Sequence, residues 1–209
     1  MDGFDQPNPA ESKFAAINMH HLLQLFMFSA TALAYQAHAT RQLDSIQIIE
    51  LQHYEGSGCA PGTVTTTVSP DHKSTTVSFG FGSIPPTPRM PCDLLFTLLY
   101  PTGCTSAVID AVYNGFEDLS PGLSGNLTAN YAIAGITSGE VPPPTLFGAG
   151  VSAPWTRTDV ITADTTVSGE SQRNVTLEDY VVLSLSDNAA IGQVTISNIT
   201  IGISREMAC

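Results

Sequence analysis

The sequence is poor in positive charge and in long apolar runs. Of its 209 residues, 7 are Lys or Arg and 19 are Asp or Glu, which gives a formal net charge of −12. Such a chain is repelled by nucleic acid and by anionic membranes, so neither is expected as a partner. Beyond residue 40, no apolar stretch reaches the roughly 20 residues that a membrane-spanning helix requires. The C-terminal segment shows no lipid-anchor signal, so no membrane anchor is expected.

Motifs of catalytic and metal sites are also missing. The chain has no Gly-x-Ser-x-Gly elbow, no Gly-rich phosphate loop and no closely spaced cysteine pair of the zinc-binding kind. The acidic pairs Glu117-Asp118 and Glu178-Asp179 are neighbours in sequence, and neighbours in a strand point to opposite faces, so neither pair forms a glycosidase dyad. We therefore predict no catalytic residue, no metal ligand and no cofactor, although two distant acids remain open as a hydrolase pair.

The N-terminal part of the chain predicts export. An apolar run from Leu22 to Tyr35 follows Met19 and has the length of a signal-peptide core. Small residues at Ala37 and Ala39 favour cleavage after Ala39. The alternative is a cytosolic N-terminus with a buried helix. The expected parts are a gene-model extension or disordered segment at 1–18, a signal peptide at 19–39 and a single secreted domain at 40–209.

Cleavage two residues earlier, after Ala37, would expose His38 as the N-terminal residue. A terminal histidine can bind copper through its amine and its ring, and His53 or His72 could complete such a site. If there is no copper site, His72 is predicted to be a solvated turn residue and His53 a polar residue of an edge strand. The copper site is therefore kept as an alternative.

Four cysteines follow the leader, at Cys59, Cys92, Cys104 and Cys209. An even number in an exported chain predicts two disulfides, for which three connectivities are possible. We expect Cys59–Cys92, which would clip a hairpin region, and Cys104–Cys209, which would tie the C-terminus to the body of the domain.

Three N-glycosylation sequons lie in the same part of the chain, and they begin at Asn126, Asn174 and Asn198. Each requires its asparagine on the surface of an exported protein. Together with the leader, they predict a secreted glycoprotein.

The pattern after the leader predicts strands. Charged residues make up only 12% of the chain, while Thr, Ser, Gly and Val are abundant, which is typical of an extracellular β protein. Leu94–Tyr100 is apolar on both sides and should be central in its sheet, and a parity change near Ser197–Asn198 predicts a β-bulge. The sequence predicts loops at Ile84–Pro91 and Ser138–Pro154, and it predicts the end of a strand at Asn114-Gly115. The expected strands are 45–54, 63–68, 75–81, 94–100, 107–113, 126–133, 160–167, 180–185 and 194–203.

These short strands, with a turn at Ser69–His72 and others between them, favour an all-β fold. The expected architecture is an antiparallel β-sandwich, jelly-roll-like and disulfide-bonded.

Several stretches resemble a fungal secreted family known as domain of unknown function 4360. The resemblance covers Gly56 to about Ile133, and Trp155-Thr-Arg157-Thr-Asp159 extends it. The family often carries a Ser-Pro-Cys element in its second half, which this chain lacks. The resemblance implies secretion and a β fold, and it implies no reaction. The matching stretches are Gly56-Ser-Gly-Cys59-Ala-Pro-Gly-Thr-Val64, Ser69-Pro-Asp71, Val77-Ser-Phe79, Pro91-Cys92-Asp-Leu94, Tyr100-Pro-Thr-Gly103, Asp110-Ala-Val-Tyr113-Asn-Gly115 and Pro121-Gly122-Leu123.

Trp155 and Arg157 are the candidate binding residues. Trp155 is the only tryptophan and lies in the Pro- and Gly-rich stretch beside Arg157. Exposed aromatic rings stack on sugars, and loops at the end of a sandwich collect binding residues. The other interpretation is that Trp155 fills the core. We predict a non-enzymatic cell-wall or host-interface protein that binds a cell-wall polysaccharide or an extracellular protein, or has a structural role. The alternative is a secreted carbohydrate-active or copper-dependent enzyme.

Overall fold

The computed structural model describes residues 45–80, 89–133, 136–137, 141–164, 173–186 and 192–207. They belong to one compact unit, Leu43–Cys209. The predicted N-terminal extension and signal peptide lie outside the described residues. Over the part that is described, no helix has the length and apolar character of a membrane span.

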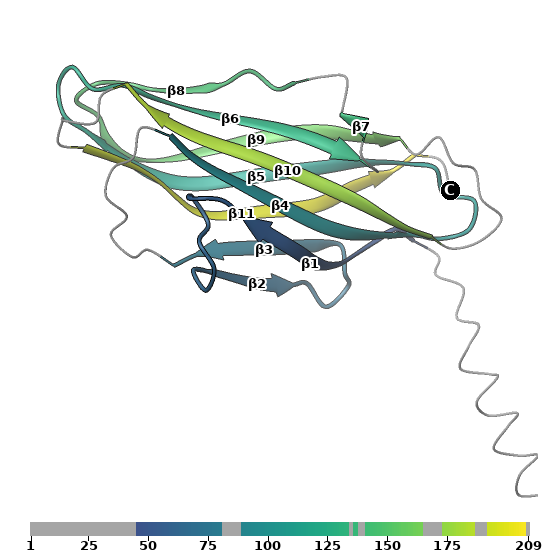
Figure 1. Cartoon of the computed structure of the whole chain (residues 1–209). Coiled ribbons are helices and arrows are strands. Elements are labelled where there is room, and N and C mark those ends of the chain that lie inside the picture. The colour runs from purple at the N-terminus through teal and green to yellow at the C-terminus, as the bar shows by residue number, and fades with distance from the viewer. Residues whose placement is uncertain are drawn as a thin grey trace, which may run out of the picture. The chain divides into compact units, whose positions relative to one another are not determined.

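One sheet, called sheet A here, contains six of the described strands in the order β1-β4-β10-β6 (Figure 1). The short strands β7 and β8 pair with opposite ends of β6. All pairings in this sheet are antiparallel. The strands are β1 (Gln47–Glu55), β4 (Arg89–Tyr100), β6 (Gly125–Ile133), β7 (Ile136–Thr137), β8 (Thr145–Phe147) and β10 (Arg173–Leu185).

The second sheet, sheet B, contains five of the described strands in the order β2-β3-β11-β5-β9, again all antiparallel. The last two strands of the chain, β10 and β11, are therefore each central in one of the two sheets. The strands of sheet B are β2 (Val64–Val68), β3 (Ser74–Phe79), β5 (Ser106–Leu119), β9 (Ser152–Asp164) and β11 (Gly192–Glu206).

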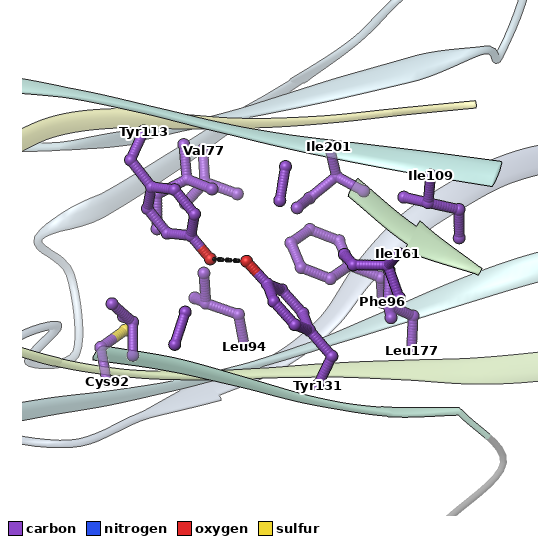
Figure 2. Close-up of a cluster of buried hydrophobic side chains, with 14 of the residues drawn as sticks. Val77, Cys92, Leu94, Phe96, Ile109, Tyr113, Tyr131, Ile161, Leu177 and Ile201 are labelled. Atoms are coloured by element: carbon purple, nitrogen blue, oxygen red, sulfur yellow. Dashed lines mark hydrogen bonds between the residues drawn. The ribbon is translucent and has the colours of Figure 1, made fainter. Parts of the chain in front are cut away.

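Alternating burial explains why the two sheets pack face to face. In β6, every second residue from Leu127 to Ile133 is buried, and the residues between them are partly exposed. β4 alternates in the same way from Cys92 to Tyr100. Side chains of this kind from both sheets form one apolar core (Figure 2). The predicted all-β, antiparallel, jelly-roll-like sandwich is confirmed.

Local predictions are confirmed where the pattern is strongest. β2 and β3 form the expected hairpin, and His72 in the turn between them has a φ of 57°. β4 lies between β1 and β10, as its two apolar sides require. The register of β11 against β5 shifts between Ile196 and Asn198, which is the predicted bulge.

Other boundaries were wrong, because the structure extends several strands into predicted loops. β4 begins at Arg89 and includes Pro91. The pairing of β1 with β4 ends at Asp93. Pro91 lies beyond this point, so the N–H that proline lacks is not needed for a hydrogen bond to β1. The predicted 138–154 loop contains β8 and the start of β9.

β5 does not end at Asn114-Gly115 and continues to Leu119, paired with β11 on one side and β9 on the other. Gly115 has a packing role there. A Cβ at this position would lie 2.4 Å from Cζ2 of Trp155 and 1.9 Å from the Thr195 carbonyl oxygen. The glycine therefore leaves the space that the Trp155 indole occupies.

The disulfide Cys59–Cys92 confirms the first predicted pairing, with a Cα–Cα distance of 5.4 Å. It joins the β1–β2 loop to β4. Gly56 in that loop has a φ of 126°, and a Cβ there would lie 2.2 Å from the Pro91 carbonyl oxygen. The Gly56–Cys59 and Pro91-Cys92 stretches are thus in direct contact. Cys104 is buried, and its predicted partner Cys209 lies outside the described residues.

The Cys59–Cys92 bond closes a loop with a sequence separation of 33. We expect the double variant Cys59→Ala/Cys92→Ala to lose about 3–4 kcal/mol of unfolding free energy, because the unfolded chain regains the entropy of that loop. Urea unfolding followed by tryptophan fluorescence would measure this as a lower midpoint. An unchanged midpoint would mean that the bond adds no stability.

Candidate functional site

The structure places both predicted binding residues on β9, and not in a loop. Trp155 is partly buried, packs against the core, and has its ring centroid 5.1 Å from that of Phe147. The side chain of Arg157 lies in the interior, and the residue is 6% exposed. The two residues point to the same side of the strand, between the sheets, so they form no exposed platform. Their role in ligand binding stays a prediction.

Arg157 belongs to a cluster of five buried side chains, called here the buried polar cluster: Tyr113, Tyr131, Arg157, Asp159 and Asp179. Nε of Arg157 donates to both carboxylate oxygens of Asp159 at 2.8 and 3.0 Å. Its Nη1 donates to the Leu127 carbonyl oxygen at 2.8 Å. The guanidinium also lies 5.8 Å from the centroid of the Tyr113 ring. The charge of Arg157 is thus paired and hydrogen-bonded, as burial requires.

The cluster continues as a chain of oxygen contacts from one sheet to the other. Tyr113 of sheet B and Tyr131 of sheet A point toward each other, with their hydroxyl oxygens 2.6 Å apart (Figure 2). The Tyr131 hydroxyl lies 2.7 Å from Oδ2 of Asp159. The Tyr113 hydroxyl lies 2.8 and 2.9 Å from the carboxyl oxygens of Asp179 on β10. Three short oxygen–oxygen links therefore connect Asp179, Tyr113, Tyr131 and Asp159.

The two tyrosine hydroxyls donate to the two carboxyl groups of this chain. Tyr113 donates to Asp179, and Tyr131 donates to Asp159. Asp159 also accepts from Arg157, whereas Asp179 is held by Tyr113.

Burial governs the electrostatics of this cluster. Complete burial, with a smaller contribution from the nearby Asp159, raises the pKa of Asp179 to about 7, although the Tyr113 hydroxyl and Arg157 oppose the shift. Burial likewise raises the pKa of both tyrosines. Because all five side chains lie between the sheets, we interpret the cluster as an interior link between the sheets and not as a reaction site.

The raised pKa of Asp179 makes stability depend on pH. In the unfolded chain its pKa is near the usual value of 3.8, and in the folded protein it is about 7. Between these values the folded state binds the proton more tightly, so the unfolding free energy falls as pH rises, by up to about 1.4 kcal/mol per pH unit. Above the folded pKa the unfolding free energy stops falling, because Asp179 is then ionised in both the folded and the unfolded state.

Asp179→Asn retains an uncharged side chain of similar shape that can donate and accept. We expect this variant to unfold with a much flatter pH dependence between pH 4 and 7, and to be more stable than the wild type above pH 7. Urea unfolding at several pH values would measure both effects. If both proteins lost stability in parallel, Asp179 would not be the titrating group.

A second feature lies on the opposite side of sheet B, facing away from the core. Two adjacent rows of side chains cross all five strands, and we call them together the polar face. Nine of their ten residues are Thr, Ser or Asn, and none is charged. In the order β2-β3-β11-β5-β9, the first row is Thr65, Ser78, Asn198, Asn114 and Thr156, and the second is Thr67, Thr76, Thr200, Val112 and Thr158.

Hydrogen bonds between neighbouring strands hold several of these side chains in place. Thr156 donates to Oδ1 of Asn114 at 2.9 Å, and Nδ2 of Asn114 donates to Oδ1 of Asn198 at 3.0 Å. In the second row, the hydroxyls of Thr76 and Thr200 are 3.0 Å apart. Phe116, the next outward residue of β5, is 39% exposed beside these rows. The polar face is therefore a partly ordered array of neutral donors and acceptors.

The outer face of sheet A differs in charge. Glu55 and Asp93 are opposite each other on β1 and β4, and His53 lies 3.5 Å from Glu55. Burial and the charge of Glu55 raise the pKa of Asp93, and His53 opposes this. Among the described residues, no three His, Cys, Asp or Glu side chains are grouped so that they could hold a metal ion. His38, on which the copper alternative depends, lies outside them.

The three sequons are distributed over both outer faces. Asn126 on β6 is partly exposed and Asn174 on β10 is exposed, both in sheet A, while Asn198 is partly exposed in the first row of the polar face. Whether they carry glycans stays a prediction. The acidic pair Glu178-Asp179 is arranged as expected for neighbours in a strand: Asp179 is buried and Glu178 is partly exposed.

Comparisons with known proteins identify relatives. A family model described as "Domain of unknown function (DUF4360)" matches residues 44–208. An "Uncharacterized secreted protein" of Arthroderma benhamiae is 33% identical over 101 residues, which cover 45% of this chain and 41% of that protein. The match thus spans less than half of the relative's length. It confirms the predicted localisation, secreted and extracellular.

Among solved structures, the "xylan-binding module CBM15" is 14% identical, with a TM-score of 0.33, and the match covers 78% of this chain and 99% of that one. The mannan-recognising module TmCBM27 is 12% identical, with a TM-score of 0.38 and coverages of 77% and 99%. Similarities at these TM-scores support no conclusion about function.

Proposed function

Since this chain belongs to the DUF4360 family, whose description names no activity, we propose a function from its own surface. It is a non-enzymatic extracellular protein that binds a neutral cell-wall polysaccharide through the polar face. The observation that carries this proposal is the pair of uncharged, hydrogen-bonding rows that cross the five strands of sheet B.

The chemistry of the polar face is complementary to sugar. Hydroxyl and amide groups both donate and accept, as do the hydroxyls of a polysaccharide. Asn114, Thr156 and Asn198 are already held by one another, so less side-chain freedom is lost when a ligand binds. A neutral ligand is favoured because the chain has a net charge of −12, which repels acidic polymers.

The dimensions of the face also fit an extended polymer. Five strands at the usual spacing place β2 and β9 about 19 Å apart, and alternate residues along a strand are about 7 Å apart. The two rows therefore form a narrow track across the strands. Phe116, 39% exposed beside the track, offers a ring on which a sugar can stack.

The test uses protein made in an oxidising bacterial periplasm, where it carries no N-glycans. We expect Thr76→Val/Thr156→Val to adsorb about 30-fold more weakly to insoluble β-glucan, chitin or mannan, because each lost hydroxyl removes about 1 kcal/mol of hydrogen bonding. Valine keeps the branched shape that strands favour. Depletion binding isotherms would measure the change.

Thr97→Val/Ser184→Ala is the matched control. It removes two hydroxyls from strands β4 and β10 of sheet A, and its adsorption should equal that of the wild type. Thermal unfolding of all three proteins would establish that the folds are equivalent. Equal adsorption of both variants, or capture of an extracellular protein with no adsorption to any polysaccharide, would contradict the proposal.

A further inference from the structure

The sequon Asn198-Ile199-Thr200 lies within the polar face. We propose that an N-glycan on Asn198 covers this face and controls its access to polysaccharide; the inference rests on the function proposed above. The glycosylated form is closed to external polysaccharide, and the form without this glycan is open.

The position of the sequon in sheet B is the first reason. β11 is the middle strand of the five. Asn198 is paired with Ser78 on one side and Asn114 on the other, and Thr200 is paired with Thr76 and Val112. Both polar residues of the sequon are therefore the central members of the two rows. A sugar attached to Asn198 is therefore flanked on both sides by residues of the polar face.

The orientation of the Asn198 amide is the second reason. Its Oδ1 accepts from Nδ2 of Asn114 at 3.0 Å, so the oxygen is directed toward β5. The attachment atom Nδ2 lies on the other side of the amide group and keeps clear of this bond. Glycosylation therefore leaves the Asn114–Asn198 hydrogen bond in place, and the folded sheet can carry the glycan.

The covalent step is the ordinary one for exported proteins and needs a lipid-linked oligosaccharide diphosphate as donor. The bond from Nδ2 to C1 of the first sugar forms as the bond from C1 to the diphosphate oxygen breaks, and Nδ2 gives up one proton. Side-chain charge does not change, because the amide is neutral before and after. The effect of the glycan on the face is thus steric and competitive.

Competition follows from the chemistry of the glycan itself. Its hydroxyls resemble those of the proposed ligand, and it is tethered at the centre of the surface that would bind that ligand. A group held by a short flexible link has an effective concentration in the millimolar range. External polysaccharide must displace it, so binding is weakened even where the glycan leaves part of the face exposed.

The other two sequons supply controls within the same molecule. Asn174 and Asn126 lie on β10 and β6 of sheet A. In both strands the residue that follows the asparagine is buried, Val175 and Leu127, so each asparagine faces away from the core. Glycans at these positions extend from the opposite side of the sandwich and leave the polar face uncovered.

The experiment uses protein secreted by a glycosylating eukaryotic host. Glycopeptide mass spectrometry gives the occupancy of Asn198, and depletion isotherms on insoluble β-glucan, chitin and mannan give adsorption. We expect occupied Asn198, and at least ten-fold stronger adsorption after native endoglycosidase treatment or in Asn198→Gln. Asn174→Gln, which removes a sequon of sheet A, should adsorb like the untreated wild type.

The outcomes separate this inference from the proposed function. An unoccupied Asn198, or equal adsorption with and without its glycan, would overturn the inference. In that case the proposed function still stands if Thr76→Val/Thr156→Val weakens adsorption. If glycan-free wild type does not adsorb to any of the polysaccharides, the proposed function itself fails. Stronger adsorption in Asn174→Gln as well would also overturn the inference, because the effect would then not belong to the polar face.

Discussion

The structure depends on one chain of hydrogen bonds that crosses the space between the sheets. Asp179, Tyr113, Tyr131 and Asp159 are linked in that order, and Arg157 closes the chain. Each of these groups would be costly to bury alone, because an unsatisfied buried donor or acceptor costs about 1–3 kcal/mol. Apolar packing can tolerate small shifts, whereas hydrogen bonds weaken steeply when their atoms move apart. The chain therefore constrains how the sheets face each other, because its links join strands of sheet A to strands of sheet B.

The polar face is built on the same strands. On β5, Tyr113 points inward and its neighbour Asn114 points outward, and on β9 the same holds for Arg157 and Thr156. A shift in the register of either strand would break the interior links and separate Asn114 from Thr156 on the surface. Interior polar bonds of this kind thus determine the order of groups on the exterior, where the proposed ligand is recognised.

Much of the fold could be predicted from alternation along single strands, as the bulge before Asn198 illustrates. What failed depends on contacts between distant strands. Asn114-Gly115 has the composition of a turn, and only the pairing of β5 with β9 shows that Gly115 leaves space for Trp155. Arg157 was predicted as a binding residue because it lies beside Trp155 in a Pro- and Gly-rich stretch, but the structure buries it and pairs it with Asp159. Asp159 lies two residues further on the same strand face, and this spacing is the signal that could have revealed the pair.

The central positions of β10 and β11 in their sheets have a consequence for the order of events during synthesis. Both follow all the other described strands in the sequence, and each joins strands made much earlier, so neither sheet can be completed until β10 and β11 have been made. Such long-range pairing is slow. β4 and β6 therefore lack the strand that joins them until β10 is made, and β3 and β5 likewise lack β11. Completion of both sheets is a late event, which the C-terminal part of the domain controls.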